Sequence, residues 1–147
     1  MVERHLAQCN VGRLVAGVDS PEVAEFMAAL GPINALADAT PGFVWRLADD
    51  DGEGATGVET GVDDDLFIVN LSVWEDLASL QHFVTRSGHS AYLRRRREWF
   101  ERPDGPVSVC WWIPVGHIPS VAEALDRIEH LREYGPSDDV FPFRAAT

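Results

Sequence analysis

The chain contains no lysine, and all of its 12 basic residues are arginine. Schiff-base chemistry therefore has no side-chain amine to use, and any cationic role falls to arginine or histidine. Basic residues are also few: 24 acidic residues oppose them, which gives a net charge of -12. This charge repels the phosphates of nucleic acids and of anionic lipids. We therefore expect neither nucleic acid nor a membrane surface as a partner.

Cysteines are few as well, and long apolar runs are missing. Cys9 and Cys110 match no metal-ligand spacing, so we interpret both as buried thiols without a disulfide. No two histidines have the spacing that binds a metal from one helix face, and no glycine-rich phosphate loop is present. No run approaches the roughly 18 apolar residues of a membrane span, and a signal-peptide pattern is missing. We expect a soluble, cytoplasmic protein that holds no metal.

What is present suits one globular domain. The 147 residues, 46% of them hydrophobic, are enough for one packed core, so we predict a single domain over residues 1–147. Ser20-Pro21 offers a helix start, Gly31-Pro32 should kink or divide that helix, and Ser120 with Glu123 forms a capping box. The predicted elements are strands over 5–12, 43–47, 66–74 and 107–115, and helices over 20–37, 77–101 and 120–135, the second helix being bent at Ser87-Gly88.

This order of strands and helices predicts an α+β fold. It fits a ferredoxin-like plait, βαββαβ plus a C-terminal helix, with a four-stranded antiparallel sheet and helices on one face. Because the strands are apolar on both faces, we expect the second face to meet the sheet of an identical subunit, which predicts a homodimer. The tail with Phe141 and Phe143 is expected to dock through its aromatic rings.

The strand over 66–74 carries the most information about function. One face is wholly apolar, whereas the other carries Asn70, Ser72 and Trp74. An unpaired amide or hydroxyl on a buried face costs roughly 1 to 3 kcal/mol, so this pattern favours a wall that contacts a ligand. In a plait the first and third strands are neighbours, which places Asn10 beside Asn70. The alternative is that these two amides form a hydrogen-bonded pair that fixes the strand register.

Four segments carry a resemblance that covers nearly the whole chain: LAQCNVGRL, INALADATPGFVWRL, NLSVWEDLASLQHFVTRSGHSAYLRRRREWF and WWIPVGHIPSVAEALDRIEHLREYGPSDDVFPF. Together they resemble an uncharacterised bacterial domain-of-unknown-function family of the dimeric alpha/beta-barrel superfamily. The resemblance implies a barrel made from the paired sheets of two subunits. It implies no single reaction, because that superfamily holds antibiotic-biosynthesis monooxygenases, haem-degrading enzymes, haem peroxidases, chlorite dismutase-like proteins and stress-response proteins.

Asn70 and Trp74 look like the Asn and Trp found at similar spacing in the cofactor-independent, quinone-forming monooxygenases of that superfamily. Asn70 is suited to hold a substrate hydroxyl or to stabilise an enolate or phenolate oxygen in a dry pocket, and Trp74 to stack on a planar ligand. The alternatives are an asparagine that pairs with a neighbouring loop and a tryptophan that closes one end of the core.

The helix that resumes after Ser87-Gly88 brings further candidates onto one face. His89 titrates near neutrality and is suited to take a proton from a phenol or enol, and Arg96 to hold the resulting oxyanion. Tyr92 and Trp99 lie alongside as substrate-binding candidates. The alternative for the arginine run over 94–97 is a solvated face that pairs with acidic residues.

Three further residues are candidates for the pocket lining. Trp45 and Trp112 would add aromatic walls, although large aromatic residues at a dimer interface explain them equally well. His117 follows the fourth predicted strand, where a loop residue can reach a pocket mouth; its alternative role is to cap a neighbouring carbonyl.

These residues lead to three functional hypotheses. The first is a cofactor-independent monooxygenase, with a cyclase or isomerase as a variant, that deprotonates a phenolic or polyketide-like substrate with the help of Asn70, His89 and Arg96. The second is a haem-binding protein in which His89 or His117 is the axial ligand. The third is a non-catalytic dimer that binds a hydrophobic or aromatic small molecule.

Overall fold

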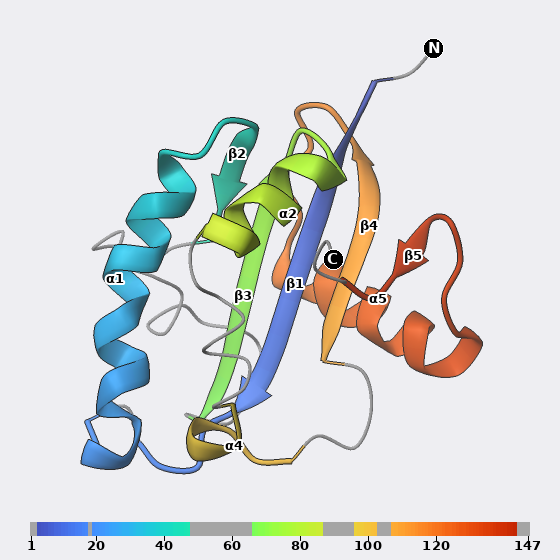
Figure 1. Cartoon of the computed structure of the whole chain (residues 1–147). Coiled ribbons are helices and arrows are strands. Elements are labelled where there is room, and N and C mark those ends of the chain that lie inside the picture. Colours follow the sequence, from blue (N-terminus) through green and yellow to red (C-terminus); the bar gives the residue numbers. More distant parts are fainter. Residues whose placement is uncertain (1–2, 18, 48–65, 87–95, 103–106, 144–147) are drawn as a thin grey trace.

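The computed structural model describes residues 3–17, 19–47, 66–86, 96–102 and 107–143. Within them the protein has an α+β fold with a five-stranded antiparallel sheet in the order β2-β3-β1-β4-β5 (Figure 1). The strands are β1 (Arg4–Arg13), β2 (Phe43–Arg46), β3 (Phe67–Trp74), β4 (Ser108–Pro114) and β5 (Val140–Phe141). The four predicted strands are therefore present, each with its bounds moved by one residue or kept. The neighbouring positions of β1 and β3 are confirmed as well.

Helices cover both faces of this sheet. They are α1 (Ala24–Asp38), which follows the short helix η1 (Pro21–Val23), then α2 (Leu77–Arg86), α4 (Arg96–Trp99) and α5 (Val121–Tyr134). Figure 1 shows α2 in front of β3 and β1, and α5 behind β1 and β4. None of the described helices has the length and apolar character that a membrane span requires.

The starts of two helices confirm the predicted caps. Ser20 Oγ accepts the backbone N–H of Glu22 at 3.3 Å, and Ser120 Oγ accepts that of Glu123 at 3.1 Å. These bonds satisfy N–H groups that have no partner within the helix. Helix α1 runs unbroken through Pro32, so the expected division at Gly31-Pro32 does not occur. Proline removes one backbone donor, and the packing of α1 on the sheet outweighs that loss.

One face of the sheet, the α5 face, carries the β1 side chains of Ala7, Cys9 and Val11, which point toward α5. The apolar stripe of α5 packs on this face beside the valines and leucine of β3, and the buried residues of this cluster are Ala7, Cys9, Val69, Leu71, Val73, Val109, Trp111, Ile113, Ala124, Ile128, Leu131 and Val140. The expectation that helices lie on one face only is therefore wrong. The apolar stripe of the last helix reveals that it packs against the core, but its spacing does not reveal which face it covers.

The α1/α2 face carries the alternate residues of the same strands, Leu6, Gln8 and Asn10 on β1 and Asn70, Ser72 and Trp74 on β3. Helices α1 and α2 pack over one end of it around Leu6 and Trp74. Helix α4 packs over the other end, where Trp99 and Phe100 contact Leu14 and Ile68. The polar positions of both strands lie between these two apolar clusters.

A bulge in β2 changes the faces that the sequence predicts for that strand. Phe43 pairs with Trp74 and Trp45 pairs with Val73, with a register shift between them. Phe43 consequently packs on the α1/α2 face and Trp45 on the α5 face. Strict alternation along the predicted strand over 43–47 would place both on one face, but the extra residue of the bulge reverses the side on which later residues point.

The tail docks as expected, and it also adds a strand that the sequence did not indicate. Phe141 in β5 pairs with Cys110 of β4, and Phe143 donates its backbone N–H to Ser108 Oγ at 3.4 Å. Both phenylalanine rings pack against the cluster beneath α1 and α2. The tail thereby covers the β4 edge of the sheet.

Candidate ligand-binding site

A cavity of about 290 Å³ lies between the α1/α2 face of the sheet and the helices above it. Its floor is largely polar and comes from β1, β3 and the first residue of β4, whereas its roof is almost wholly apolar. The described floor residues are Gln8, Asn10, Gly12, Ile68, Asn70, Ser72, Trp74 and Ser108, and the described roof residues include Phe26, Ala29, Leu30, Ile33, Leu80, Phe83, Val84, Trp99 and Phe100. A site of this character suits a mostly apolar ligand that carries a few polar atoms.

Two asparagine side chains lie at the centre of the floor. Asn10 and Asn70 face each other in the β1–β3 register, which confirms the predicted pairing of these positions. Asn70 is exposed and Asn10 half-buried, although both sit on inner strands of the sheet. Within the described residues neither side chain makes a hydrogen bond, to the other or elsewhere. The hydrogen-bonded pair expected as the alternative is thus not formed, and both amides are accessible from the cavity.

A directed chain of hydrogen bonds crosses the floor beside these asparagines. Trp74 Nε1 donates to Ser72 Oγ at 2.9 Å, and Ser72 Oγ donates to Gln8 Oε1 at 3.1 Å. The three residues are 1%, 7% and 5% exposed, respectively. Because an indole N–H can only donate, Ser72 Oγ must act as its acceptor. The chain explains why β3 and β1 carry polar residues that are buried.

Aromatic clusters close the cavity at both ends. At one end the Trp74 ring stacks on Phe83 with ring centres 5.2 Å apart, and Phe43 meets it edge-on at 5.4 Å. At the other end Phe26 contacts the rings of Trp99 and Phe100 at 5.6 and 5.0 Å. Trp74 therefore closes one end of the core, as its alternative interpretation expected, while it also contributes to the cavity wall.

Arg46 is the one charged side chain among the described lining residues, and the sequence analysis missed it. Its Nε and Nη2 donate to the two carboxylate oxygens of Asp38 at 2.8 and 3.1 Å. Arg46 pairs with Ser72 in the β2–β3 register, so it extends the polar row that contains Gln8. As the residue after Trp45 it points to the opposite face, and the β2 bulge determines which face that is.

The comparison with known proteins identifies a family. A family model described as a domain of unknown function, DUF3291, matches residues 5–147. The chain belongs to the DUF3291 family. No curated protein and no solved structure matches it. The expected membership of a domain-of-unknown-function family is confirmed, and the family description assigns no activity, so the function of this DUF3291 protein has to be argued from the cavity.

The structure brings four of the residues singled out for function to the cavity: Asn10, Asn70, Trp74 and Trp99. His89 and Tyr92 lie outside the described residues. Arg96 begins helix α4, but its side chain also lies outside them. The proposed base and the proposed oxyanion-binding arginine therefore stay predictions.

The structure does not bring Trp45, Trp112 or His117 to the described lining of the cavity. Trp45 points to the α5 face because of the β2 bulge. Trp112 lies on the α1/α2 face but beyond the cavity, where the Arg4 guanidinium sits 5.3 Å from its ring centre. Neither position supports an aromatic lining of this cavity, and a role of these residues in ligand binding stays a prediction.

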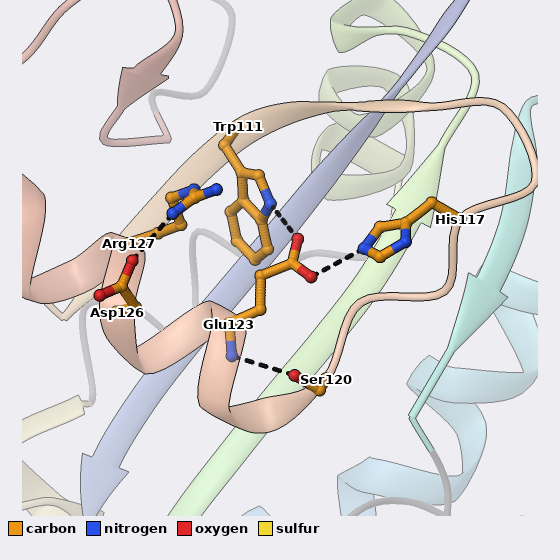
Figure 2. Close-up of polar contacts among 6 residues, drawn as sticks. All are labelled: Trp111, His117, Ser120, Glu123, Asp126 and Arg127. Carbon is orange, nitrogen blue, oxygen red and sulfur yellow. Dashed lines mark hydrogen bonds and ion pairs between the residues drawn. The ribbon is translucent and has the colours of Figure 1, made fainter.

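His117 lies beside the first turn of α5 (Figure 2). Its Nε2 is 2.7 Å from Glu123 Oε1, while Glu123 Oε2 accepts the indole N–H of Trp111 at 2.9 Å. Burial by itself raises the pKa of Glu123, but the hydrogen bonds from His117 and Trp111 outweigh it and lower the pKa below its ordinary value. The three residues connect the loop after β4, the first turn of α5 and the sheet.

The described residues offer little to a metal or a haem iron. No group of three or more His, Cys, Asp and Glu side chains in the described part of the chain could hold a metal ion. The described cavity lining includes no histidine, and His117 is committed to Glu123. Burial raises the pKa of the Cys9 and Cys110 thiols to about 12, which keeps both protonated and weakly reactive at neutral pH.

Proposed function

We propose that this DUF3291 protein binds a planar, mostly apolar small molecule with an oxygen function in the cavity and oxidises it without a bound cofactor. The observation that carries the proposal is the pair of amides on the floor, Asn10 and Asn70. Both face the cavity that lies over the α1/α2 face of the sheet. A central strand position is normally filled by an apolar side chain packed against a helix. Polar side chains beside a cavity that have no partner among the described residues, as these two have none, are instead typical of a binding site.

The two layers of the cavity suit different parts of such a ligand. Ring carbons packed beneath Leu30, Ile33 and Phe83 would lose contact with water, which stabilises binding by roughly 25 cal/mol for each Å² of apolar surface buried. A hydroxyl or carbonyl oxygen directed at the floor would hydrogen-bond to the Asn10 and Asn70 amides. Since an amide both donates and accepts, the floor accepts a phenol, its phenolate or a ketone.

The reaction we propose converts a phenol into a para-quinone. The phenol loses its O–H proton to a base, the role predicted for His89. Dioxygen then adds at the ring carbon opposite the oxygen, that carbon loses its hydrogen, and the two protons released end in the water formed. One oxygen atom of dioxygen becomes the new carbonyl, and the other leaves as water, so the four electrons lost by the ring reduce one dioxygen molecule. Deprotonation makes the ring electron-rich enough to reduce dioxygen itself, and Asn70 favours the deprotonated form by hydrogen bonding to the phenolate oxygen.

The finer fold assignment and the assembly belong to the same proposal. We propose a ferredoxin-like plait of the antibiotic-biosynthesis monooxygenase type that pairs into a homodimer. The strand order β2-β3-β1-β4 supports the plait. Support for pairing comes from Trp45, Leu47 and Phe67, which are only partly buried on the α5 face, and from exposed Val44 on the edge strand β2. Sedimentation equilibrium of the full chain would distinguish a dimer from a monomer.

Oxygen uptake with an electron-rich phenol tests the proposed function. We expect naphthol or anthrone to cause oxygen consumption without hydrogen peroxide, because the second oxygen atom leaves as water. Asn70→Leu should reduce the rate at least about tenfold, since it removes the amide that stabilises the phenolate. His82→Asn, on an exposed position of α2 outside the described lining, is the matched control and should keep the wild-type rate.

The same assay separates the alternatives. Binding of naphthol by calorimetry without oxygen uptake would leave a non-catalytic binding protein in place of an oxygenase. No binding of any bicyclic phenol or ketone at millimolar concentration would contradict the proposed function as a whole.

A further inference from the structure

Gln8 lies on the cavity floor next to the asparagine pair. It is two residues from Asn10 on β1, so both side chains point to the α1/α2 face. Two residues along a strand correspond to roughly 6.6 to 6.8 Å. The floor therefore carries two polar rows, one with Asn10 and Asn70 and one with Gln8 and Ser72, at a separation close to the width of a fused aromatic ring.

The hydrogen-bond chain on the floor fixes which end of the Gln8 amide is used. Trp74 gives its indole N–H to Ser72, and Ser72 gives its hydroxyl hydrogen to Gln8 Oε1. The carbonyl oxygen of Gln8 is thus already an acceptor, and its two N–H donors remain. Within the described residues these donors have no partner.

Gln8 is 5% exposed, and it lines the cavity. Its amide nitrogen is not among the buried atoms left without a partner, so the N–H donors are accessible from the cavity, where water or a ligand can accept from them. The buried chain of Trp74, Ser72 and Gln8 thus presents donors to the same space that the asparagines face, from the neighbouring row. Ser72 and Trp74 act as positioning residues for these donors.

We propose that Gln8 donates to a second oxygen of the ligand, so that the cavity selects planar ring systems with oxygen functions at both ends of one ring, as in a para-quinone. This inference rests on the proposed function. It implies that the asparagine row holds the oxygen that the phenol brings. Gln8 then donates to the oxygen that the reaction adds.

A pair of matched ligands tests the inference. Para-naphthoquinone and alpha-tetralone are both fused bicyclic ketones, but the first has two carbonyl oxygens on opposite sides of one ring and the second has one. In calorimetric titrations of the full-length protein we expect naphthoquinone to bind about five to ten times more tightly, as one additional hydrogen bond would give. Mass spectrometry afterwards checks that neither thiol has added to the quinone.

Variants of Gln8 then test whether this residue causes the tighter binding of naphthoquinone relative to tetralone. Gln8→Met keeps the length and apolar part of the side chain but removes the amide, and should bring the affinity ratio of the two ligands close to one while tetralone binding stays unchanged. Gln8→Glu keeps the acceptor for Ser72 and removes the donors, so it should disfavour naphthoquinone further. Ser72→Ala should reduce the ratio only partly, because it loosens Gln8 without removing it.

The outcomes separate the inference from the proposed function. Equal affinity of the two ligands for the wild-type protein would overturn the inference and needs no variant to fold. A wild-type preference that survives in Gln8→Met or Gln8→Glu would overturn it as well. In both cases tetralone still binds and the proposed function stands, whereas failure of both ligands to bind would contradict the proposed function itself.

Discussion

On β3, consecutive residues have opposite surroundings. Val69, Leu71 and Val73 point to α5 and are each 1% exposed, whereas Asn70, between two of them, is exposed on the floor of a cavity. β1 shows the same contrast, with Ala7 and Cys9 fully buried in the α5 cluster and Gln8 and Asn10 on the cavity floor. One set of strands thus makes one close-packed face and one face that leaves space.

The contrast between the two faces indicates that the α5 face stabilises the fold, whereas the α1/α2 face provides the proposed binding site. Side chains on the α5 face fill space and stabilise the fold by burial. Polar side chains on the cavity floor contribute little to packing, and their groups that lack partners carry a cost that a ligand can offset. Substitutions on the α5 face should therefore lower the free energy of unfolding, whereas substitutions on the cavity floor should mainly lower ligand affinity.

The largest effect on stability is expected for Leu71→Ala on the α5 face. Leu71 is 1% exposed, so the substitution leaves a cavity and should lower the free energy of unfolding by about 2 to 5 kcal/mol. Chemical denaturation monitored by tryptophan fluorescence measures it. Val115→Ala, at an exposed position just after β4, is the control and should change stability by less than about 0.5 kcal/mol. A loss below about 1 kcal/mol for Leu71→Ala would mean that the α5 face is not close-packed.

The next effect is expected at the attachment of α5 to the sheet. Glu123→Gln removes the carboxylate that accepts from Trp111 and contacts His117, and should lower stability at neutral pH by about 1.5 kcal/mol. Because the pKa of Glu123 is lowered by folding, its contribution is complete above its ordinary pKa of 4.5 and is lost as pH falls through the lower folded value.

Unfolding measured between pH 7 and pH 3 should therefore show wild type and Glu123→Gln converging at acid pH. The opposite behaviour, a difference that grows as the pH falls, would rule out the hydrogen-bonded carboxylate as the cause. Ligand affinity should be the same in both proteins at neutral pH, since Glu123 lies outside the described cavity lining.

A smaller effect on stability is expected for Trp74→Phe at the end of the cavity. Phenylalanine keeps a ring against Phe83 but removes the N–H that donates to Ser72, which should lower stability by about 1 kcal/mol. Because Ser72 and Gln8 are then held less firmly, affinity for naphthoquinone should fall about threefold while tetralone binding changes less. Calorimetry on both ligands checks this, and an equal fall for the two would indicate a general change of the cavity shape.

The smallest effect on stability is expected for Asn70→Leu. Asn70 is exposed and makes no hydrogen bond within the described residues, so the free energy of unfolding should change by less than about 0.5 kcal/mol. Tetralone affinity should nevertheless fall about tenfold, because the amide that binds its oxygen is gone. A large loss of stability would place Asn70 in the structural core and remove it from the binding site.

Much of this arrangement follows from local patterns in the sequence. Alternation over 66–74 separates the apolar residues from Asn70, Ser72 and Trp74, and the order of elements places Asn10 opposite Asn70, as the register has it. Ser120 and Glu123 mark the start of α5 correctly. These features depend on neighbours in the chain or on a common strand order, so a single sequence contains them.

Other features depend on tertiary contacts that local patterns do not encode. The bulge between Phe43 and Trp45 interrupts a strict alternation without any glycine to mark it, and it decides which side Trp45 and Arg46 reach. The stripe of α5 fits either face of a sheet equally well. The donor-to-acceptor direction of the hydrogen bonds that run from Trp74 through Ser72 to Gln8 follows only from the side-chain geometry.

Side-chain amide resonances offer the most direct test of the claim that the cavity floor is a binding site. Proton–nitrogen correlation spectra, recorded while naphthoquinone is titrated into the wild-type protein, report on both faces of the sheet together. We predict that the side-chain NH₂ signals of Gln8, Asn10 and Asn70 shift with ligand concentration, while the backbone signals of Ala124, Ile128 and Leu131 in α5 stay in place. Shifts confined to α5, or none at the three amides despite measurable binding, would contradict a binding site on the cavity floor.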